Sequence, residues 1–505
     1  YAYNIYVIFL DISSAGLPVA MSKIIKEYNT LGMMDAKVRA YKLGKRVVNF
    51  VSVAAFICLF LFAGNIASLI LGDLQGGNTI SDVAFVIRCV SFAILVIPFL
   101  SISKGYLQGH NIINVSSISQ VIEQVVRIAV ILGGSYIALN IFHLSLTTSV
   151  GIAVFGAFCG GIAAILYIVK NMRKHKEELS FTGNIKKDDI SDSEIIKKIL
   201  SYAIPFIIID VGVSVYNFVD MVLISRTMVH LGFDAATTEF ITSSVSAWAG
   251  KINMVVNAIA MGLTVSLIPN IVEAFTLKKW NLVESRLNKA LQIIIVTCVP
   301  MVLGISLLSK PIWGIFYGIE ELSLGGLVLG VYIFIALFFN IYMVTSSTLQ
   351  SLNKFKAVYL TTLLGYLTNA FLDVPLMLLC HVLGLEPFIG AVMASILGYS
   401  LSAISTLVLL NKEHKLKYNE TFKVMFKILL PTIMMVLVVV LLKLVIPINY
   451  MSRLSSIIYV TVISIIGSLV YLFITYKMGI LTLVFGKEYL NKIVKKVTFG
   501  KIDLK

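Results

Sequence analysis

Charged residues are scarce in this sequence of 505 residues: they make up 13% of the chain, whereas apolar residues make up 58%. A soluble protein of this length carries roughly twice that share of charge. The apolar runs are long and unbroken, which excludes the alternating pattern of a membrane β-barrel. Because a helix needs about 20 apolar residues to cross a bilayer core of about 30 Å, the composition predicts an all-α polytopic membrane protein.

Residues and motifs that typically carry catalytic chemistry are also missing. The five cysteines are odd in number and fit no metal-site spacing, and the six histidines are scattered. The sequence has no Walker A loop and no HExxH or GxSxG motif. We therefore expect no cofactor, no metal and no enzymatic activity. Basic and aromatic residues do not alternate in the way that stacks bases, so nucleic acid is not an expected partner.

The apolar runs predict about thirteen transmembrane spans joined by short connections. The predicted spans are residues 3–22, 47–71, 84–103, 115–139, 148–169, 201–225, 244–272, 288–309, 325–350, 357–380, 388–410, 424–446 and 455–476.

The positive charge predicts the orientation of these spans. The formal net charge is +15, and 34 of the 41 Lys and Arg residues fall on connections and ends that share one side if Tyr1 faces outward. Connections on the cytoplasmic side of membrane proteins are enriched in Lys and Arg. We therefore expect a multi-pass protein of the cell membrane with a cytoplasmic C-terminus.

Three short matches in the same order suggest an internal repeat. They pair residues 14–18 with 265–269, Gly72 with Gly318, and Leu107-Gln108 with Leu349-Gln350, at offsets of 251, 246 and 242 residues. Such a repeat is typical of transporters built from two related halves. The span 201–225 has no counterpart in the first half, so one helix is expected before Tyr1. The full protein would then have two parallel six-helix lobes plus two C-terminal helices, fourteen spans in all, with both termini cytoplasmic.

This repeat divides the chain into five parts. They are an N-terminal lobe at 1–169 without its first helix, a cytoplasmic linker at 170–200, a C-terminal lobe at 201–410, two extra transmembrane helices at 411–478, and an amphipathic cytoplasmic tail at 479–505. The tail alternates apolar residues with lysines, a pattern that favours binding to anionic lipid. The alternative is a frayed, solvated tail.

Several ionisable residues fall at predicted membrane depth, where they are costly and usually face a cavity or a partner. Glu123 and Arg127 share one helix face, because they are four residues apart. Either they form a self-neutralising structural pair, or they line a polar cavity between the halves. The others are Asp11, Asp210, Asp220, Lys251 and Asp373, of which Asp373 is expected to be structural.

Lys251 has no carboxylate within one helical turn, and its neighbours Asn253 and Asn257 are polar. An ammonium at this depth needs water, a partner from another span or an anionic ligand. The alternative is that Lys251 extends its charged end to the outer interface. Asp210 and Asp220 are candidate partners for Lys251 or Arg127.

Four segments resemble a known family. They are residues 15–23 (AGLPVAMSK), 27–29 (EYN), 105–109 (GYLQG) and 119–127 (SQVIEQVVR). The sequence resembles the polysaccharide-biosynthesis exporters of the multidrug/oligosaccharidyl-lipid/polysaccharide superfamily. Among these it is most similar to the MurJ-type lipid II flippases of Gram-positive bacteria, which are related to SpoVB. The resemblance covers nearly the whole chain.

The resemblance implies a fourteen-helix fold with a central cavity whose basic residues meet a pyrophosphate. By location, the candidate substrate-binding residues are Lys251, Arg127 and Lys23, with Glu123 and Asn253 beside them. The candidate ion-coupling residues are Asp11, Asp210 and Asp220. The implied function is alternating access that moves undecaprenyl-pyrophosphate-linked lipid II from the inner to the outer leaflet. The expected partners are that anionic lipid-linked saccharide and membrane lipids, with the membrane potential or an ion gradient as the energy source.

Three other functions stay open at this stage. One is a flippase for another lipid-linked polysaccharide precursor, such as a capsule or spore-cortex precursor. The second is a multidrug or cation antiporter of the same superfamily, in which cavity carboxylates and aromatic residues would be expected. The third is a membrane scaffold without transport activity, for which a polar interior would have no use.

Overall fold

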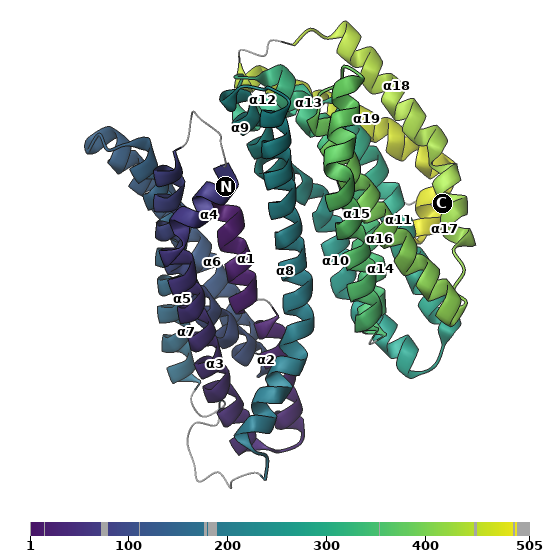
Figure 1. Cartoon of the computed structure of the whole chain (residues 1–505). Helices are drawn as coiled ribbons and strands as arrows, with labels where there is room; N and C mark the ends of the chain where they lie inside the picture. The colour runs from purple at the N-terminus through teal and green to yellow at the C-terminus, as the bar shows by residue number, and fades with distance from the viewer. Residues whose placement is uncertain are drawn as a thin grey trace. The chain divides into compact units, whose positions relative to one another are not determined.

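The fold is all-helical over the residues that the structure, a computed structural model, describes (Figure 1). These residues are 2–14, 16–71, 79–110, 112–175, 179, 189–352, 354–448, 452–487 and 490–491. A few further side chains within helices, among them Asp210 and residues 264–270, lie outside this description. The chain folds into two compact units, Tyr1–Val222 and Leu223–Lys505.

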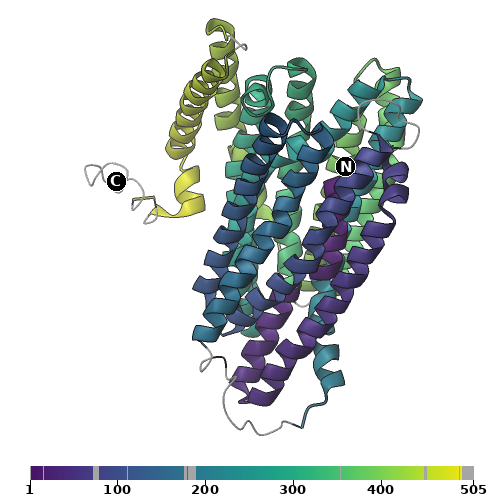
Figure 2. The ribbon, with the colours of Figure 1, turned by 90° about the vertical axis from the view of Figure 1, so that its left-hand side faces the viewer.

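The first unit is a bundle of long helices that run side by side in both views (Figures 1 and 2). Its elements are α1 (Ala2–Ser14), α2 (Leu17–Thr30), α3 (Met34–Leu61), α4 (Ala63–Leu71), α5 (Ile80–Gly109), α6 (Ile113–Ala129), the π-helical turns η1 (Val130–Gly134) and η2 (Ile137–Ile141), α7 (Leu146–Lys174), and most of α8 (Asp192–His230).

The second unit contains the rest of α8 and the remaining helices. They are α9 (Ala235–Ser243), the π-helical turn η3 (Ser244–Trp248), α10 (Ala249–Thr276), α11 (Trp280–Leu307), α12 (Ser309–Tyr317), α13 (Leu322–Tyr332), α14 (Ile335–Ser351), α15 (Phe355–Val382), α16 (Phe388–His414), α17 (Asn419–Lys427), α18 (Leu429–Val445), α19 (Arg453–Lys477) and α20 (Ile480–Phe485).

The prediction of a polytopic α-helical membrane protein is confirmed. Within the described part of the chain, ten helical segments are long and apolar enough to cross a membrane. The predicted spans 201–225 and 244–272 coincide with two further long helices, α8 and α10. Most of the tail predicted at 479–505 lies outside the described residues, and only α20 represents it.

Four predicted spans each fall on two successive helices in the structure: 3–22, 47–71, 325–350 and 424–446. Residues 3–22 were expected to form one helix, but the helix breaks between α1 and α2. Gly16 is left-handed there, with φ of 67°, and Pro18 occupies the first turn of α2. Proline suits a first helical turn because its missing N–H has no helical partner there, and glycine has no Cβ to oppose a positive φ. Apolar periodicity alone does not reveal such a break.

The break lets α2 approach α5 closely, and the family-like segments 15–23 and 105–109 meet here. A Cβ built on Gly105 would lie 2.5 Å from the carbonyl oxygen of Pro18, and one on Gly109 would lie 2.7 Å from Cβ of Ile25. Tyr106, in the same segment, is fully buried. These glycines are therefore required by backbone packing between α2 and α5.

Candidate functional site

Three charged side chains form a cluster between α5 and α6. Lys104 Nζ lies 3.0 Å from Glu123 Oε2, and Arg127 Nη2 lies 3.4 Å from Glu123 Oε1. The side chains of Lys104, Glu123 and Arg127 are 14%, 9% and 24% exposed. Two cations thus share one buried carboxylate, which leaves the cluster with a formal charge of +1.

Glycines on α7 hold the backbone of α6 close to this cluster. A Cβ on Gly160 would lie 2.5 Å from the carbonyl oxygen of Glu123, and one on Gly156 would lie 3.1 Å from that of Arg127. Contacts this tight fix the position of α6. Glu123 is therefore held on the buried side of its helix, where its carboxylate meets Lys104.

Asp11 makes a long-range polar contact within the first unit. It accepts a hydrogen bond from the Ser214 hydroxyl, which joins α1 to α8 across 203 residues of sequence. Asn4 Nδ2 lies 3.3 Å from Met221 Sδ and connects the same two helices. The α1–α8 contact is thus partly polar at predicted membrane depth.

Glu27 is the centre of a second charged cluster, at the predicted cytoplasmic end of the first unit. Lys198 Nζ donates to Glu27 Oε1 at 2.7 Å, and the Tyr202 hydroxyl donates to Oε2 at 3.3 Å. Lys23 Nζ lies 4.2 Å from the centre of the Tyr202 ring, and Lys198 Nζ lies 4.9 Å from that of Tyr28. The cluster ties the start of α8 to α2.

Two of these groups have shifted pKa values. Burial by itself would lower the pKa of Lys198, but the hydrogen bond and the charge attraction to Glu27, together with contributions from two neighbouring tyrosines, outweigh it and the pKa is raised. Burial raises the pKa of Tyr28, although the nearby Lys198 ammonium opposes this. Both groups therefore hold their protons more tightly than usual.

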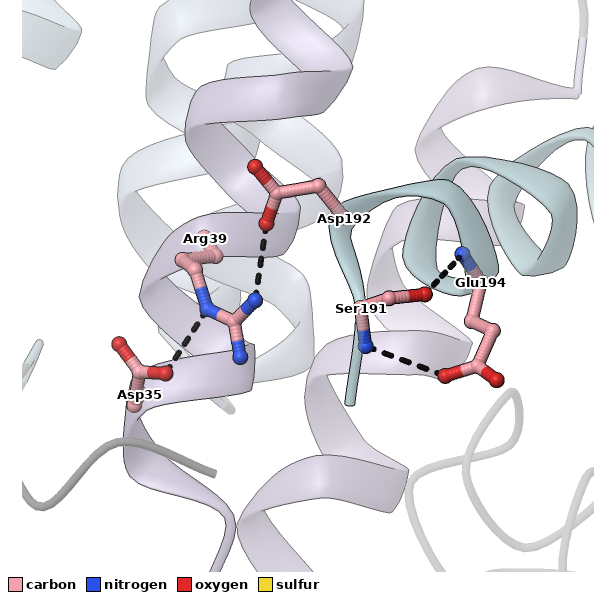
Figure 3. Close-up of polar contacts among 5 residues, drawn as sticks. All are labelled: Asp35, Arg39, Ser191, Asp192 and Glu194. Atoms are coloured by element: carbon pink, nitrogen blue, oxygen red, sulfur yellow. Dashed lines mark hydrogen bonds and ion pairs between the residues drawn. The ribbon is translucent and has the colours of Figure 1, made fainter. Parts of the chain in front are cut away.

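Arg39 adds a further ionic contact between α3 and α8 (Figure 3). Its Nε lies 2.8 Å from Asp35 Oδ2, and its Nη1 lies 2.8 Å from Asp192 Oδ1. Ser191 and Glu194 form a capping box, in which each side chain accepts from the backbone N–H of the other, at 3.2 and 3.1 Å. The start of α8 is thus both capped and anchored to two helices.

The second unit holds two of the predicted substrate-binding residues, both on α10. Lys251 is exposed and Asn253 is 5% exposed. Across from this helix, Asn340 on α14 donates to the carbonyl oxygen of Val256 at 3.4 Å. This face of α10 therefore carries a buried amide, Asn253, close to the buried amide of Asn340.

The second unit also contains an apolar cavity of about 380 Å³. Helices α11, α18, α19 and α20 line it, and its lining includes Pro300, Gly304, Met435, Val439, Leu481 and Phe485. Apolar linings of this kind suit hydrocarbon. No sequence pattern had pointed to this cavity.

Of the other predicted residues, Glu123, Arg127, Lys23, Asp11 and Asp220 all lie in the first unit. The structure joins Glu123 and Arg127 in an ion pair, and it places Asp220 on α8 with 9% of its surface exposed. Asp210 lies on α8 with its side chain outside the described residues. Asp373 on α15 is fully buried. Whether these residues share one cavity stays a prediction.

Sequence reasoning missed Lys104, Ser214 and the role of Glu27. Lys104 was assigned to a connection, although it lies within α5, and α6 packs against α5 so that Lys104 meets Glu123. Glu27 lay in a segment that supported the resemblance, but the segment did not reveal its partners. For Ser214, no local pattern links it to Asp11.

Comparisons with known proteins agree with this architecture. Residues 1–260 match the family described as Polysaccharide biosynthesis protein, and residues 205–374 match the MatE family. The Lipid II flippase MurJ of Bacillus subtilis (strain 168) is 32% identical over 424 residues, which cover 83% of this chain and 77% of that protein.

Two solved structures share the fold. A lipid II flippase MurJ in an inward closed conformation superimposes with a TM-score of 0.64 at 18% identity, over 94% of this chain and 96% of that one. A multidrug resistance MATE family transporter in an inward-facing conformation gives 0.62 at 15% identity, over 82% and 89%. This multi-pass membrane chain belongs to the polysaccharide biosynthesis protein family and, within it, to the MurJ-type proteins.

Proposed function

We propose that the protein moves lipid II, an undecaprenyl-pyrophosphate-linked peptidoglycan precursor, from the inner to the outer leaflet by alternating access. The observation that carries this proposal is the 32% identity to the lipid II flippase MurJ over 83% of the chain. The proposed role is transport without catalysis. The proposed location is the cell membrane, with both termini of the full protein cytoplasmic.

The charges support an anionic substrate. The pyrophosphate of lipid II carries about two negative charges, and a desolvated phosphate is best met by Lys and Arg donors. The cluster of Lys104, Glu123 and Arg127 has an excess of one cation, and Glu123 and Arg127 lie at predicted membrane depth. We propose that Arg127 and Lys104 contact the pyrophosphate, with Lys251, Lys23, Glu123 and Asn253 as the further substrate-binding residues.

The apolar cavity supports a lipid-linked substrate, because it offers hydrocarbon contacts to part of a polyprenyl chain. The membrane potential supplies energy for the export of an anion. At about 2.3 kcal/mol per charge per 100 mV, two charges that cross the whole field gain about 4–5 kcal/mol. If an ion gradient contributes, Asp11, Asp210 and Asp220 are the proposed coupling residues.

The direct test is flipping of fluorescent lipid II by the purified protein in liposomes, read by a membrane-impermeant quencher. We expect the wild-type protein to flip lipid II. Arg127→Ala or Lys251→Ala should reduce the flipping rate at least tenfold, which corresponds to the loss of a hydrogen bond to a charged group. Lys423→Ala is the matched control, because this lysine is 65% exposed in a surface ion pair. If both variants flip at the wild-type rate, the binding-site assignment is wrong.

Multidrug transport is the second candidate, favoured by the MatE match over residues 205–374. The same liposomes distinguish the two functions. Export of a cationic dye without movement of lipid II would favour multidrug transport. Depletion of the protein in its own host would identify the saccharide, since the precursor that accumulates inside is the substrate. Accumulation of a precursor other than lipid II would assign a different lipid-linked polymer.

A further inference from the structure

Glu123 occupies the position that an anionic ligand of Lys104 and Arg127 would take. Each of its oxygens faces a different cation: Oε2 lies 3.0 Å from Lys104 Nζ, and Oε1 lies 3.4 Å from Arg127 Nη2. Phosphate oxygens bind lysine and arginine donors in the same manner. The carboxylate thus offsets part of the positive charge of both cations within the protein.

This neutralisation is incomplete in two respects. Two cations face one carboxylate, so one positive charge remains. Arg127 Nε is also buried and has no hydrogen-bond acceptor among the residues that the structure describes. A guanidinium has five donors, and a single contact of 3.4 Å leaves most of them available. A ligand with more oxygens and more charge than a carboxylate would satisfy this arginine better.

The cluster is not sealed from its surroundings. Arg127 is 24% exposed and Lys104 is 14% exposed, whereas Glu123 is 9% exposed. Next to them on α6, Gln120 and Gln124 are exposed polar residues. The two cations are therefore more accessible than the carboxylate that holds them, as an approaching anion requires.

We propose that Glu123 is an internal competitor of the substrate's pyrophosphate, an inference that rests on the proposed function. Between transport events Glu123 holds Lys104 and Arg127. During transport the pyrophosphate displaces the carboxylate from these two residues, and its return helps to expel the pyrophosphate afterwards. Competition of this kind weakens binding and speeds release, so Glu123 sets the balance between affinity and turnover.

The variant Glu123→Gln tests this role, because it removes the charge and keeps the shape. Calorimetric titration with inorganic pyrophosphate should give about tenfold tighter binding than in the wild type, within the usual range of coupling between ligands. Flipping kinetics should show a lower KM and a lower kcat together. A merely structural Glu123 would reduce thermal stability without any gain in affinity, and that result would overturn the proposal.

Two control variants show whether a gain in pyrophosphate affinity is specific to the charge of Glu123. Glu420→Gln removes a charge from an exposed ion pair with Lys423 and should leave pyrophosphate affinity unchanged. Glu123→Asp keeps the charge and should stay close to wild-type affinity. An increase in affinity with Glu420→Gln equal to that with Glu123→Gln would reflect net charge alone and would contradict the proposal.

If Glu123→Gln does not fold, a second pair of variants tests the same role. Lys104→Gln keeps the pair of Glu123 and Arg127 intact, and the double variant Lys104→Gln/Glu123→Gln removes only the competitor from that background. The double variant should bind pyrophosphate more tightly than Lys104→Gln, and equal or weaker binding would contradict the proposal. If the variants bind pyrophosphate more tightly but the wild-type protein does not flip lipid II, the proposed function is refuted and the competing role of Glu123 stands.

Discussion

Gly105 on α5 lies directly against the backbone of Pro18 on α2. A Cβ at Gly105 would approach the Pro18 carbonyl oxygen to 2.5 Å and its Cα to 2.6 Å. Backbone atoms cannot move aside as a flexible side chain can. The contact therefore fixes how the chain restarts as a helix after the left-handed Gly16.

Gly105→Ala is expected to destabilise the protein by about 1–3 kcal/mol, as other overpacked substitutions do. The measurement is thermal unfolding of the purified protein in detergent. Gly64→Ala is the matched control, because no atom lies within 4 Å of the added Cβ. Its stability should be retained or should rise by up to about 0.5–1 kcal/mol, because Gly64 lies in the helix α4. Equal shifts for the two variants would show that the contact with Pro18 does not determine the effect.

The ion pair of Glu27 and Lys198 should give a small coupling free energy. Its side chains are 35% and 29% exposed, so solvent screens the pair and a value of about 0.5 kcal/mol is expected. A double-mutant cycle with Glu27→Gln and Lys198→Met measures it, since methionine keeps an apolar stem beside Tyr28. The pair of Glu420 and Lys423 is 60% and 65% exposed and should couple more weakly. A larger coupling in that pair would contradict the screening argument.

Alkaline pH should destabilise the first unit through Lys198 and Tyr28. Both pKa values are raised in the folded state, so the folded protein binds these protons more tightly than the unfolded chain. The stability they contribute is present below the unfolded values of about 10 and is lost as pH rises through the folded values. The Tm should therefore fall above about pH 10. Tyr28→Phe should reduce that fall, whereas Tyr136→Phe, at an exposed position, should leave it unchanged.

Gly304→Leu tests the apolar cavity. Gly304 lines the cavity, and no atom lies within 4 Å of a Cβ added there, so the position has room for a side chain that enters the cavity. The Tm should be retained or raised, because glycine within a helix costs about 0.5–1 kcal/mol relative to alanine. Flipping of a substrate with a long polyprenyl chain should slow, whereas a short-chain analogue should be unaffected. Gly262→Leu, outside the cavity lining, is the control, and equal slowing of both substrates would argue against a lipid-chain site.

The membrane class and most spans were predictable because apolar runs of about 20 residues have few alternatives in a bilayer. The helix break at Gly16 could not be predicted from the apolar pattern, because it depends on the left-handed backbone conformation of this residue. The pairing of Glu123 with Arg127 followed from their spacing on one helix. The contact of Lys104 with Glu123 was missed because the two residues lie on different helices. Residue spacing within one helix does not show how α5 and α6 align with each other.

The hydrogen bond from Ser214 to Asp11 has a consequence for the biogenesis of the protein. The two residues are 203 positions apart, so at about 5–20 residues per second the ribosome needs about 10–40 s to produce the partner after Asp11 is made. During that interval the first helices reach the membrane with a carboxyl group that lacks its final donor. The early assembly intermediate must therefore keep Asp11 near water, at the insertion machinery or at the bilayer surface, until α8 arrives.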